Sequence, residues 1–487
     1  MKTYRLLLII AVASLFAACS TTKNIPEGDQ LFTGLDAITY EAPEKSRHYA
    51  AIQEELDAAL ATAPNGALFG SSSVRSPLQV GLWVWNAFTN DDSNFGRWML
   101  KSFGKQPVLM SWVNPELRAS VAKEVLRAHG YFRGDVSYKA RTLRNPKKAK
   151  IAYTVNAGHL FTIDTLQYLG FPAAGDSLIR STLSDAKIKP GDPFDVSTLE
   201  GERTRLSTLF RNNGYFYWQP SYASYLADTT VPGKVQVRLQ AIEKLPAKAK
   251  RPWYVGNICI DLRKNYLDAL TDSFQRGSFM VRFRGRRPPL RVPVILQGTK
   301  LRSHKLYSYQ DYQESMAHVS STGLFSVVDF TFTPRDTTSA NDTLDLRINT
   351  VLDKPYDFYV EGNLVGKTNN RVGPGLVMGF TKRNAFRGGE LLDINLKGSY
   401  EWQTSQQGER SKSKFNSYEY GVDASLMFPR MVIPFVDFFR DRLARYYRRN
   451  RFYAVPTTTL KMSSDIISRA NYFKRHIVSG EWTYSLQ

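Results

Sequence analysis

Two cysteines and six histidines are among the side chains of this 487-residue sequence that could act as nucleophiles or metal ligands. Cys259 lies in the apolar stretch GNICIDL, which favours a buried small side chain over a nucleophile. No HExxH, GxSxG, Walker A or strand-embedded GxGxxG pattern occurs. The sequence therefore predicts no enzyme, no metal site and no cofactor. The histidines are scattered without metal-ligand spacing, at His48, His129, His159, His304, His318 and His476.

Cys19 differs from Cys259 because of the residues before it. A short basic start precedes an apolar run, residues 6–17, that is too short to cross a bilayer as a helix. The run is typical of a secretory signal peptide and ends in LFAAC. This ending resembles the lipobox of bacterial lipoproteins, in which the cysteine thiol takes a diacylglyceryl group and the chain is cut just before it. The resemblance implies a signal peptide at 1–18 and a lipidated Cys19. The alternative is an ordinary signal peptide with an incidental cysteine.

The net charge is +21 at pH 7. Such an excess suggests an anionic partner, either nucleic acid or a charged membrane surface, against the alternative of a solvated basic surface. A lipoprotein is not cytoplasmic, so nucleic acid loses most of its weight as a partner. The basic stretch RFRGRRPPLR, 282–291, could grip phosphates, although its prolines more simply mark an extended loop. No segment after the signal is apolar and long enough for a transmembrane helix.

Three stretches repeat a Gly-x-Phe pattern after a helix-like run: RAHGYFRG, RNNGYFYW and SSTGLFSV. The glycines Gly130, Gly214 and Gly323 are expected just beyond a helix end, where the left-handed backbone makes a Cβ costly. The phenylalanines two residues later are expected to pack back under the same helix as the next strand begins. They are Phe132, Phe216 and Phe325.

Each of these helices also has a recognisable start. Asn114 before Pro115 can cap the first helix. Ser197 and Glu200 have capping-box spacing in the second, and Ser308 can cap the third. The apolar residues at helical spacing are expected to be buried. They are Leu117, Val121 and Val125 in the first helix, Leu199, Leu206, Leu209 and Phe210 in the second, and Met316 and Val319 in the third.

Two predicted strands follow each helix stop, and a further strand follows the first two pairs. The repeated unit is thus strand, helix or helices, Gly-x-Phe, strand, strand; the alternative is one α/β domain with recurring helix stops. This order resembles the polypeptide-transport-associated (POTRA) domain, which is β-α-α-β-β with a glycine ending its second helix. The resemblance predicts domains at 19–158, 159–245 and 251–353, with insertions at 81–112 and 276–300.

After residue 353 the helical periodicity gives way to long strand-like alternation. In LDINLKGSYEW, 392–402, and YEYGVDASLMF, 418–428, apolar and polar residues alternate. Strands of about 11 residues can cross a bilayer when tilted, whereas the strands of globular proteins are typically about five or six residues long. Membrane-crossing strands are therefore expected, with a soluble sandwich as the alternative. Six strands are predicted, at 356–366, 371–383, 389–404, 413–428, 455–463 and 471–486.

The connections between these strands carry further signals. The turn KRNAFRGGE, 382–390, resembles the first periplasmic turn of the BamA/TamA barrel family. On that topology the polar loop 405–414 faces the exterior, and 437–452 faces the periplasm either as a surface helix or as a plain charged turn. Six strands cannot close a barrel. We therefore expect either a fragment of a longer protein or completion of the barrel by another chain.

Lipobox, repeats and barrel-like strands in this order resemble the BamA/TamA outer-membrane assembly family, and its lipid-anchored TamA-like branch, the TamL lipoproteins. The resemblance implies an α+β chain of tandem POTRA-like domains followed by the first strands of a transmembrane antiparallel β-barrel, 354–487. It implies insertion or translocation of proteins at the cell outer membrane, with periplasmic N-terminal domains and a lipid anchor. The implied partners are unfolded outer-membrane or surface proteins, outer-membrane lipids and a periplasm-spanning TamB-like protein, without nucleic acid.

Small POTRA sheets expose strand edges that can accept a client strand by β-augmentation. In the second repeat this edge is expected at 216–224. Two other functions stay open on the sequence: a passive outer-membrane channel with periplasmic receptor domains, and a non-catalytic binding lipoprotein.

Overall fold

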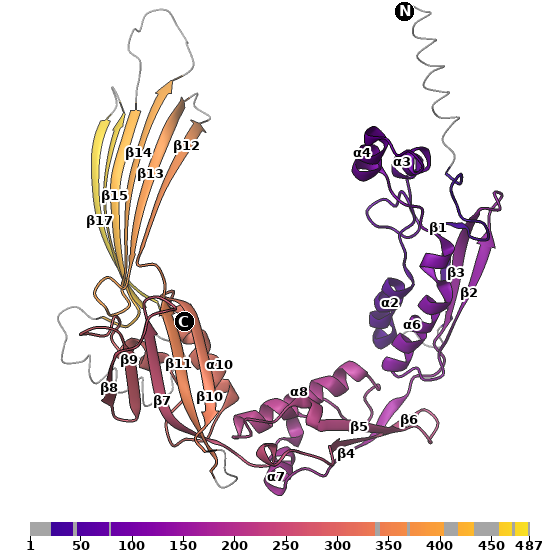
Figure 1. Cartoon of the computed structure of the whole chain (residues 1–487), viewed down its shortest axis with the longest axis horizontal. Helices are drawn as coiled ribbons and strands as arrows, with labels where there is room; N and C mark the ends of the chain where they lie inside the picture. Colours follow the sequence, from indigo (N-terminus) through magenta and orange to yellow (C-terminus); the bar gives the residue numbers. More distant parts are fainter. Residues whose placement is uncertain are drawn as a thin grey trace, which may run out of the picture. The chain divides into compact units, whose positions relative to one another are not determined.

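A computed structural model describes most of the chain, in two compact units (Figure 1). Unit 1 comprises Met1–Leu206 and Pro220–Lys244, and unit 2 comprises Ser207–Gln219 and Leu245–Gln487. The described residues are 21–41, 46–76, 79–336, 341–367, 371–403, 417–432, 457–469 and 473–485. Cys19 and its signal segment, the loop 405–414 and the arginine-rich stretch 437–452 all lie outside these residues.

Unit 1 begins with a three-stranded sheet and two helices that share one core. β1 runs parallel to β3, and β2 runs antiparallel to β3, so the order is β1-β3-β2. The predicted insertion adds α3 (Val80–Phe88), α4 (Asn94–Phe103) and α5 (Met110–Val113). The module itself consists of β1 (Leu31–Glu41), α2 (Arg47–Leu60), α6 (Pro115–Ala128), β2 (Asp135–Thr142) and β3 (Lys148–Asn156).

The second module repeats this topology with the order β4-β6-β5. Again the first strand is parallel to the third and the second is antiparallel to it. The last turn of α8 belongs to unit 2. The elements are β4 (Thr162–Leu169), α7 (Ala173–Ser181), η1 (Leu183–Asp185), α8 (Val196–Asn212), η2 (Pro220–Tyr222), β5 (Ala223–Asp228) and β6 (Lys234–Ala241).

The third module, in unit 2, keeps the topology and widens the sheet to the order β10-β11-β7-β9-β8. The predicted insertion 276–300 supplies β9, which pairs parallel with β7 and antiparallel with β8, whereas the new edge strand β8 precedes that insertion. The elements are η3 (Ala247–Ala249), β7 (Tyr254–Arg263), β8 (Asp272–Arg276), β9 (Phe279–Phe283), α9 (Pro293–Gly298), α10 (Tyr309–Ser321), β10 (Phe325–Pro334) and β11 (Thr343–Leu352).

Six strands then pair in sequence order into one antiparallel sheet. The predicted α+β class, with β-α-α-β-β modules followed by antiparallel strands, is confirmed. The fifth strand extends beyond its predicted end at 463 to Arg469, because the ladder continues from Ser464 opposite Val478 to Arg469 opposite Phe473. The strands are β12 (Tyr356–Lys367), β13 (Arg371–Arg383), β14 (Leu391–Gln403), β15 (Ser417–Phe428), β16 (Thr457–Arg469) and β17 (Phe473–Ser485).

The two faces of this sheet differ in chemistry, as the alternation predicted. Leu396 lies opposite Val422 on one face, where both side chains are exposed. On the other face the Lys397 ammonium lies 3.5 Å from an Asp423 carboxylate oxygen and 2.9 Å from one of Asp465. Three neighbouring strands are thus joined by one ion-pair cluster on the polar face. Among the described residues, no helix is sufficiently long and apolar to span a membrane.

Two details of the helices correct the sequence predictions. Leu117 and Val121 are 58% and 46% exposed, so the predicted stripe of α6 is wrong at these two positions, while Val125 is partly buried against the core. The buried side of α6 instead consists of Ala119, Ala122 and Leu126, which belong to the core of the first module. In α8, the helix begins one residue earlier than the predicted cap Ser197. The Asp195 carboxylate accepts hydrogen bonds from the Ser197 and Thr198 amides and is the real cap.

Candidate functional site: strand edges and module joints

Each module leaves the strand after its Gly-x-Phe at a sheet edge. In the described sheets β2, β5 and β10 each pair with one neighbour only. Their other backbone groups form a template on which another extended chain can pair. The edge predicted at 216–224 is wrong in its placement. Residues 216–219 form a turn, in which Trp218 N–H donates to the Tyr215 carbonyl, and β5 begins only at Ala223.

A groove of about 410 Å³ runs between α6 and the edge strand β2. Its floor is formed by Ala119 and Val136, and the Lys123 ammonium lies 2.8 Å from an Asp135 carboxylate oxygen at its rim. The exposed edge and the groove are adjacent because α6 packs on the sheet beside β2. An added strand could therefore pair with β2 and place every second side chain toward α6.

A second groove, of about 300 Å³, lies beside the edge strand β10 and is lined by Tyr312 of α10 together with Arg211 of α8 and Phe216 of the turn after it. Aromatic side chains line it, with the Tyr312 and Phe330 ring centroids 6.1 Å apart. Phe332 also contributes and contacts Tyr307 with a centroid separation of 5.4 Å. This groove offers apolar ring surfaces, in contrast to the mixed lining beside β2.

The first Gly-x-Phe forms a joint between the first two modules, all within unit 1. Gly130 has φ of +89°, and its carbonyl accepts a hydrogen bond from Phe161 N–H at 2.9 Å. A Cβ on Gly130 would lie 2.7 Å from the carbonyl oxygen of Phe194. Phe132 packs against Phe161 and Phe194, with centroids 5.2 and 5.0 Å apart. Phe132 therefore enters the core of the following module.

The second Gly-x-Phe makes the same contacts inside unit 2. Gly214 has φ of +92°, and its carbonyl accepts from Trp253 N–H at 2.8 Å. A Cβ there would lie 2.6 Å from a Leu306 methyl carbon. Phe216 packs against Tyr307 and Phe332, with centroids 5.0 and 5.2 Å apart. The two joints thus share the positive φ, the hydrogen bond to the glycine carbonyl and the inserted phenylalanine, but the glycine faces a backbone oxygen in the first and a leucine side chain in the second.

These contacts correct the expected role of the first two phenylalanines. Phe132 and Phe216 do not fold back under their own helices. The residue between glycine and phenylalanine does so instead: Tyr131 is 4% exposed and meets Tyr49 edge-on, and Tyr215 is 2% exposed and meets Phe210 edge-on. The two neighbouring aromatic side chains thus pack on opposite sides of the joint.

The third copy is built differently. Gly323 has φ of +64°, but a Cβ there would meet nothing within 4 Å. The carbonyl of Leu324 accepts from Asp353 N–H at 2.9 Å, and Phe325 packs in the core of its own module. At position 323 only the positive φ favours glycine. At positions 130 and 214 the positive φ and the close approach of neighbouring atoms both favour glycine.

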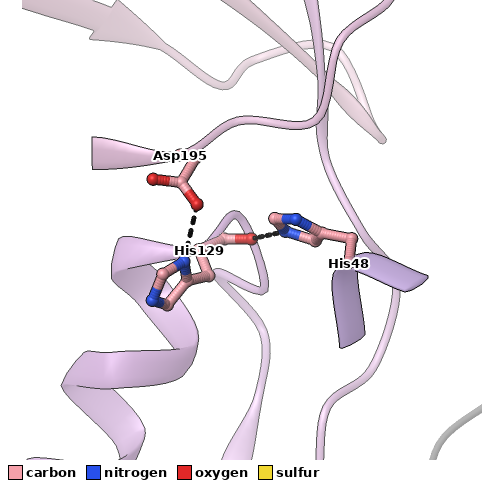
Figure 2. Close-up of side chains that lie close together, drawn as sticks. All are labelled: His48, His129 and Asp195. Atoms are coloured by element: carbon pink, nitrogen blue, oxygen red, sulfur yellow. Dashed lines mark hydrogen bonds and ion pairs between the residues drawn. The ribbon is translucent and has the colours of Figure 1, made fainter. Parts of the chain in front are cut away.

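His129 adds charge to the first joint (Figure 2). Its Nδ1 lies 2.7 Å from an Asp195 carboxylate oxygen and its Nε2 lies 2.9 Å from one of Glu55. The His48 Nε2 meets the His129 backbone carbonyl at 3.0 Å. The sequence spacing did not reveal this cluster, because Asp195 caps α8 and Glu55 lies in α2, both far from His129 in the chain. The ligand-type atoms of His48, His129 and Asp195 lie within 4.8 Å of one another, but all are used in hydrogen bonds.

Each ring nitrogen of His129 faces a carboxylate, which accepts a hydrogen bond. Both nitrogens can donate only when the ring is protonated, so the two carboxylates favour the charged imidazolium. Burial lowers the pKa of His129, but the hydrogen bonds to Asp195 and Glu55 outweigh it and raise the pKa above its ordinary value. For Asp195 burial raises the pKa, yet bonds from Ser197 and His129 bring it below its usual range. The first joint thus contains an ion pair, His129–Asp195, whose strength depends on the protonation of His129 and therefore on pH.

Unit 2 also fixes the first turn of the six-stranded sheet against the third module. The Arg387 guanidinium donates to the Pro288 carbonyl at 2.6 Å, and Asn384 Nδ2 donates to the Pro289 carbonyl at 2.9 Å. The buried Glu390 carboxylate accepts from Gly388 N–H at 2.8 Å. Part of the stretch 282–291 therefore binds this turn through the carbonyls of Pro288 and Pro289.

Arg282 in the same stretch is not available for phosphates. Its Nε donates to the Asp261 carboxylate at 2.6 Å, and Asp261 is fully buried in β7. Cys259 lies beside this pair, with its sulfur 3.5 Å from an Asp261 oxygen. Burial, followed by the Asp261 charge, raises the pKa of the Cys259 thiol, which disfavours the nucleophilic thiolate.

The fold resembles solved structures at low sequence identity. POTRA3-5 of BamA from Haemophilus influenzae is 13% identical, with 67% of this chain and 99% of that chain covered at a TM-score of 0.32. BamA from Haemophilus ducreyi lacking POTRA domains 1-3 is 12% identical, covering 66% and 58% at a TM-score of 0.36. CdiB from Acinetobacter baumannii is 8% identical, covering 67% and 58% at a TM-score of 0.27.

No protein-family model matches the sequence, and no curated protein matches it. Structural similarity at this level does not establish a family for the chain. Its own strand edges, joints and sheet are the basis for assigning a function.

Proposed function

We propose that the chain is an outer-membrane protein assembly or translocation factor. Client polypeptides bind in extended form to the free edges of the periplasmic modules and are then inserted or exported through the β-barrel to which the six antiparallel strands belong. No catalytic residue, nucleotide or metal takes part. The clients are unfolded outer-membrane or surface proteins, and a periplasm-spanning TamB-like protein is a further partner.

The observation that carries this proposal is the repeated free edge. β2 and β10 each lie at an edge beside a groove formed with the second helix of their module. Backbone pairing supplies affinity for any extended segment, and the groove selects alternate side chains only loosely. A protein that handles many clients needs this combination of strong backbone recognition and weak sequence preference.

The six-stranded sheet supports a location in the membrane. Its strands are 12 or 13 residues long, which is enough to cross the hydrocarbon layer when tilted. One face exposes apolar side chains such as Leu396 and Val422, while the other carries the Lys397 ion-pair cluster. This division suits a wall with lipid on one side and a polar lumen on the other.

The remaining parts of the proposal concern anchoring and domain limits. A lipid on Cys19, after removal of residues 1–18, would hold the periplasmic modules at the outer membrane. POTRA-like domains at 19–158, 159–245 and 251–353 and a barrel part at 354–487 complete the organisation. Replacing Cys19 by serine should abolish acyl labelling and block mature processing, and unchanged labelling would remove the anchor from this proposal.

The function is tested by photo-crosslinking along β10, Phe325–Pro334, in the full-length protein in cells. Crosslinks to nascent outer-membrane proteins should recur at every second position, because alternate residues of a paired strand face the same side. Positions on β11, which is paired on both sides, are the matched control and should give none. Depletion should lower the surface level of the same clients. An even or absent pattern with an unaltered surface proteome would contradict client handling.

Two alternatives predict different results. A passive channel would conduct ions in planar bilayers while its depletion leaves the surface proteome normal. A binding lipoprotein with a soluble sandwich would be released from membranes once Cys19 is replaced. The long alternating strands favour retention in the membrane under the same treatment.

A further inference from the structure

The helical hairpin α3–α4 presents a row of aromatic side chains to the outside. Phe88, Phe95, Trp98 and Phe103 follow one another with ring centroids 5.8, 6.1 and 5.9 Å apart. The last three are 60%, 55% and 54% exposed. Such rings together leave roughly 300 Å² of contiguous apolar surface uncovered, within the size of the largest apolar patch on a typical monomer, which is often functional. Figure 1 shows α3 and α4 side by side, apart from α2 and α6.

The pattern of α4 is that of a helix lying in a membrane surface. Its buried contact is made through Gly96, and Phe95, Trp98 and Phe103 occupy the exposed apolar side. Arg97 and Lys101 fall on the remaining side at helical spacing. An apolar face with Trp and Phe, flanked by basic residues, binds the boundary between acyl chains and anionic headgroups.

The hairpin is also fixed to the start of the described chain. Asn24 N–H donates to Asn86 Oδ1, and Asn24 Nδ2 donates to the Asn86 carbonyl, both at 3.1 Å. Asn86 is only 6% exposed, so these bonds are shielded from water. Beside them Leu82 of α3 is buried with Ile25, Leu31 and Leu109. The position of the aromatic row relative to Asn24 is therefore set by the fold.

Cys19 lies five residues before Asn24, a distance that an extended chain spans with at most about 18 Å. A lipid on Cys19 would hold Asn24, and with it the hairpin, within that reach of the membrane surface. We propose that α3–α4 is a lipid-docking element whose aromatic row inserts beside the Cys19 anchor, with Arg97 and Lys101 at the headgroup phosphates. This step rests on the lipid anchor proposed above. Docking at a second point gives the first module a defined orientation at the membrane.

The test uses the full-length acylated protein in phosphatidylethanolamine and phosphatidylglycerol vesicles, with Cys259→Ser as background. An environment-sensitive fluorophore is attached at Ser102→Cys, on the aromatic side of α4, or at Glu124→Cys, exposed on α6. Lipids with a nitroxide near the headgroup should quench the fluorophore at position 102 at least about twice as strongly as the fluorophore at position 124. Equal quenching at the two positions would overturn the proposal.

Two further variants separate the contributions. Phe95→Ser with Trp98→Ser should reduce quenching at 102 to the level at 124, and persistence of quenching would overturn the role of the aromatic row. Acyl labelling measures lipidation of Cys19 independently of the quenching. Quenching at 102 in an unacylated Cys19→Ser protein would support docking and count against the need for an anchor. Lack of quenching in an acylated protein would overturn docking and leave the anchor and the client-handling function in place.

Discussion

The joints at Gly130 and Gly214 share a backbone plan but differ in the side chains that complete it. Each glycine has a positive φ, accepts a hydrogen bond from the first strand region of the next module and sends a phenylalanine into that module. The first joint then adds the His129–Asp195 ion pair. The second adds the Arg211 guanidinium 3.6 Å from the Tyr309 ring centroid. The short motif sets the geometry, and residues outside it decide whether the joint responds to pH.

The largest expected effect is that of filling the glycine positions. Gly130→Ala and Gly214→Ala should each cost about 3 kcal/mol of local opening free energy, because strain at positive φ adds to a clash. Gly323→Ala, where space is open, should cost only about 1 kcal/mol from backbone strain alone. Hydrogen exchange of the Phe161 and Trp253 amides in the full chain measures the two joints.

Full-length protein is needed for this comparison. Residues 207–219 belong to unit 2, and the Leu306 contact of Gly214 lies outside the second predicted domain, 159–245, so that domain in isolation would lack it. Equal effects at Gly130 and Gly323 would show that conformation alone, and no close approach, explains the glycines.

A smaller effect is expected from removing the inserted rings. Phe132→Ala and Phe216→Ala should each cost about 2 kcal/mol, below the range of a fully buried phenylalanine because both rings are partly exposed. Tyr266→Ala, on a 75% exposed side chain, is the control and should change exchange little. If Phe132→Ala altered only the amides of α6, the assignment of this ring to the following module would be wrong.

Sequence patterns predicted the modules and the strands well because both depend on periodicity. Helix stops, cap residues such as Asn114 and Ser308, and alternation after 353 are local signals. The destination of Phe132 could not be predicted, because it depends on partners 29 and 62 residues away, Phe161 and Phe194. An aromatic residue at the start of each following module, in HLFTI and RPWYV, was the available signal.

The placement of the edge strand and of His129 was missed for the same physical reason. The turn at 216–219 forms because Phe216 is held by Tyr307 and Phe332, which no local pattern reveals. The carboxylates around His129 come from helices far apart in the chain. Local propensity describes an element, but contacts of high sequence separation decide where it ends and what surrounds it.

A pH titration separates the joints further. The pKa of His129 is raised, so its stabilisation is complete below the unfolded pKa of about 6.5 and is lost as pH rises through the folded pKa. Protection of the Phe161 amide, corrected for intrinsic exchange, should fall by about 1 kcal/mol or less over this range. The pKa of Asp195 is lowered, so its contribution is present above about 3.9 and is lost in acid.

His129→Gln is the matched variant, since it keeps a side chain able to hydrogen-bond but removes the titration. It should flatten the profile of the Phe161 amide and leave that of the Trp253 amide unchanged. A similar pH response at both amides would mean that the His129 ion pair is not the cause.

The smallest expected effect belongs to Arg211 in the second joint. Its guanidinium stacks on Tyr309, and no histidine or carboxylate takes part in this contact, so it should act equally from pH 5 to pH 8. Arg211→Gln should lower the protection of the Trp253 amide by about 0.5–1 kcal/mol at every pH in that range. Arg211→Lys keeps the charge but loses the planar stacking, and should recover part of the loss. Full recovery by lysine would assign the stabilisation to charge alone, and a pH-dependent loss would show that the second joint contains a titrating group like the first.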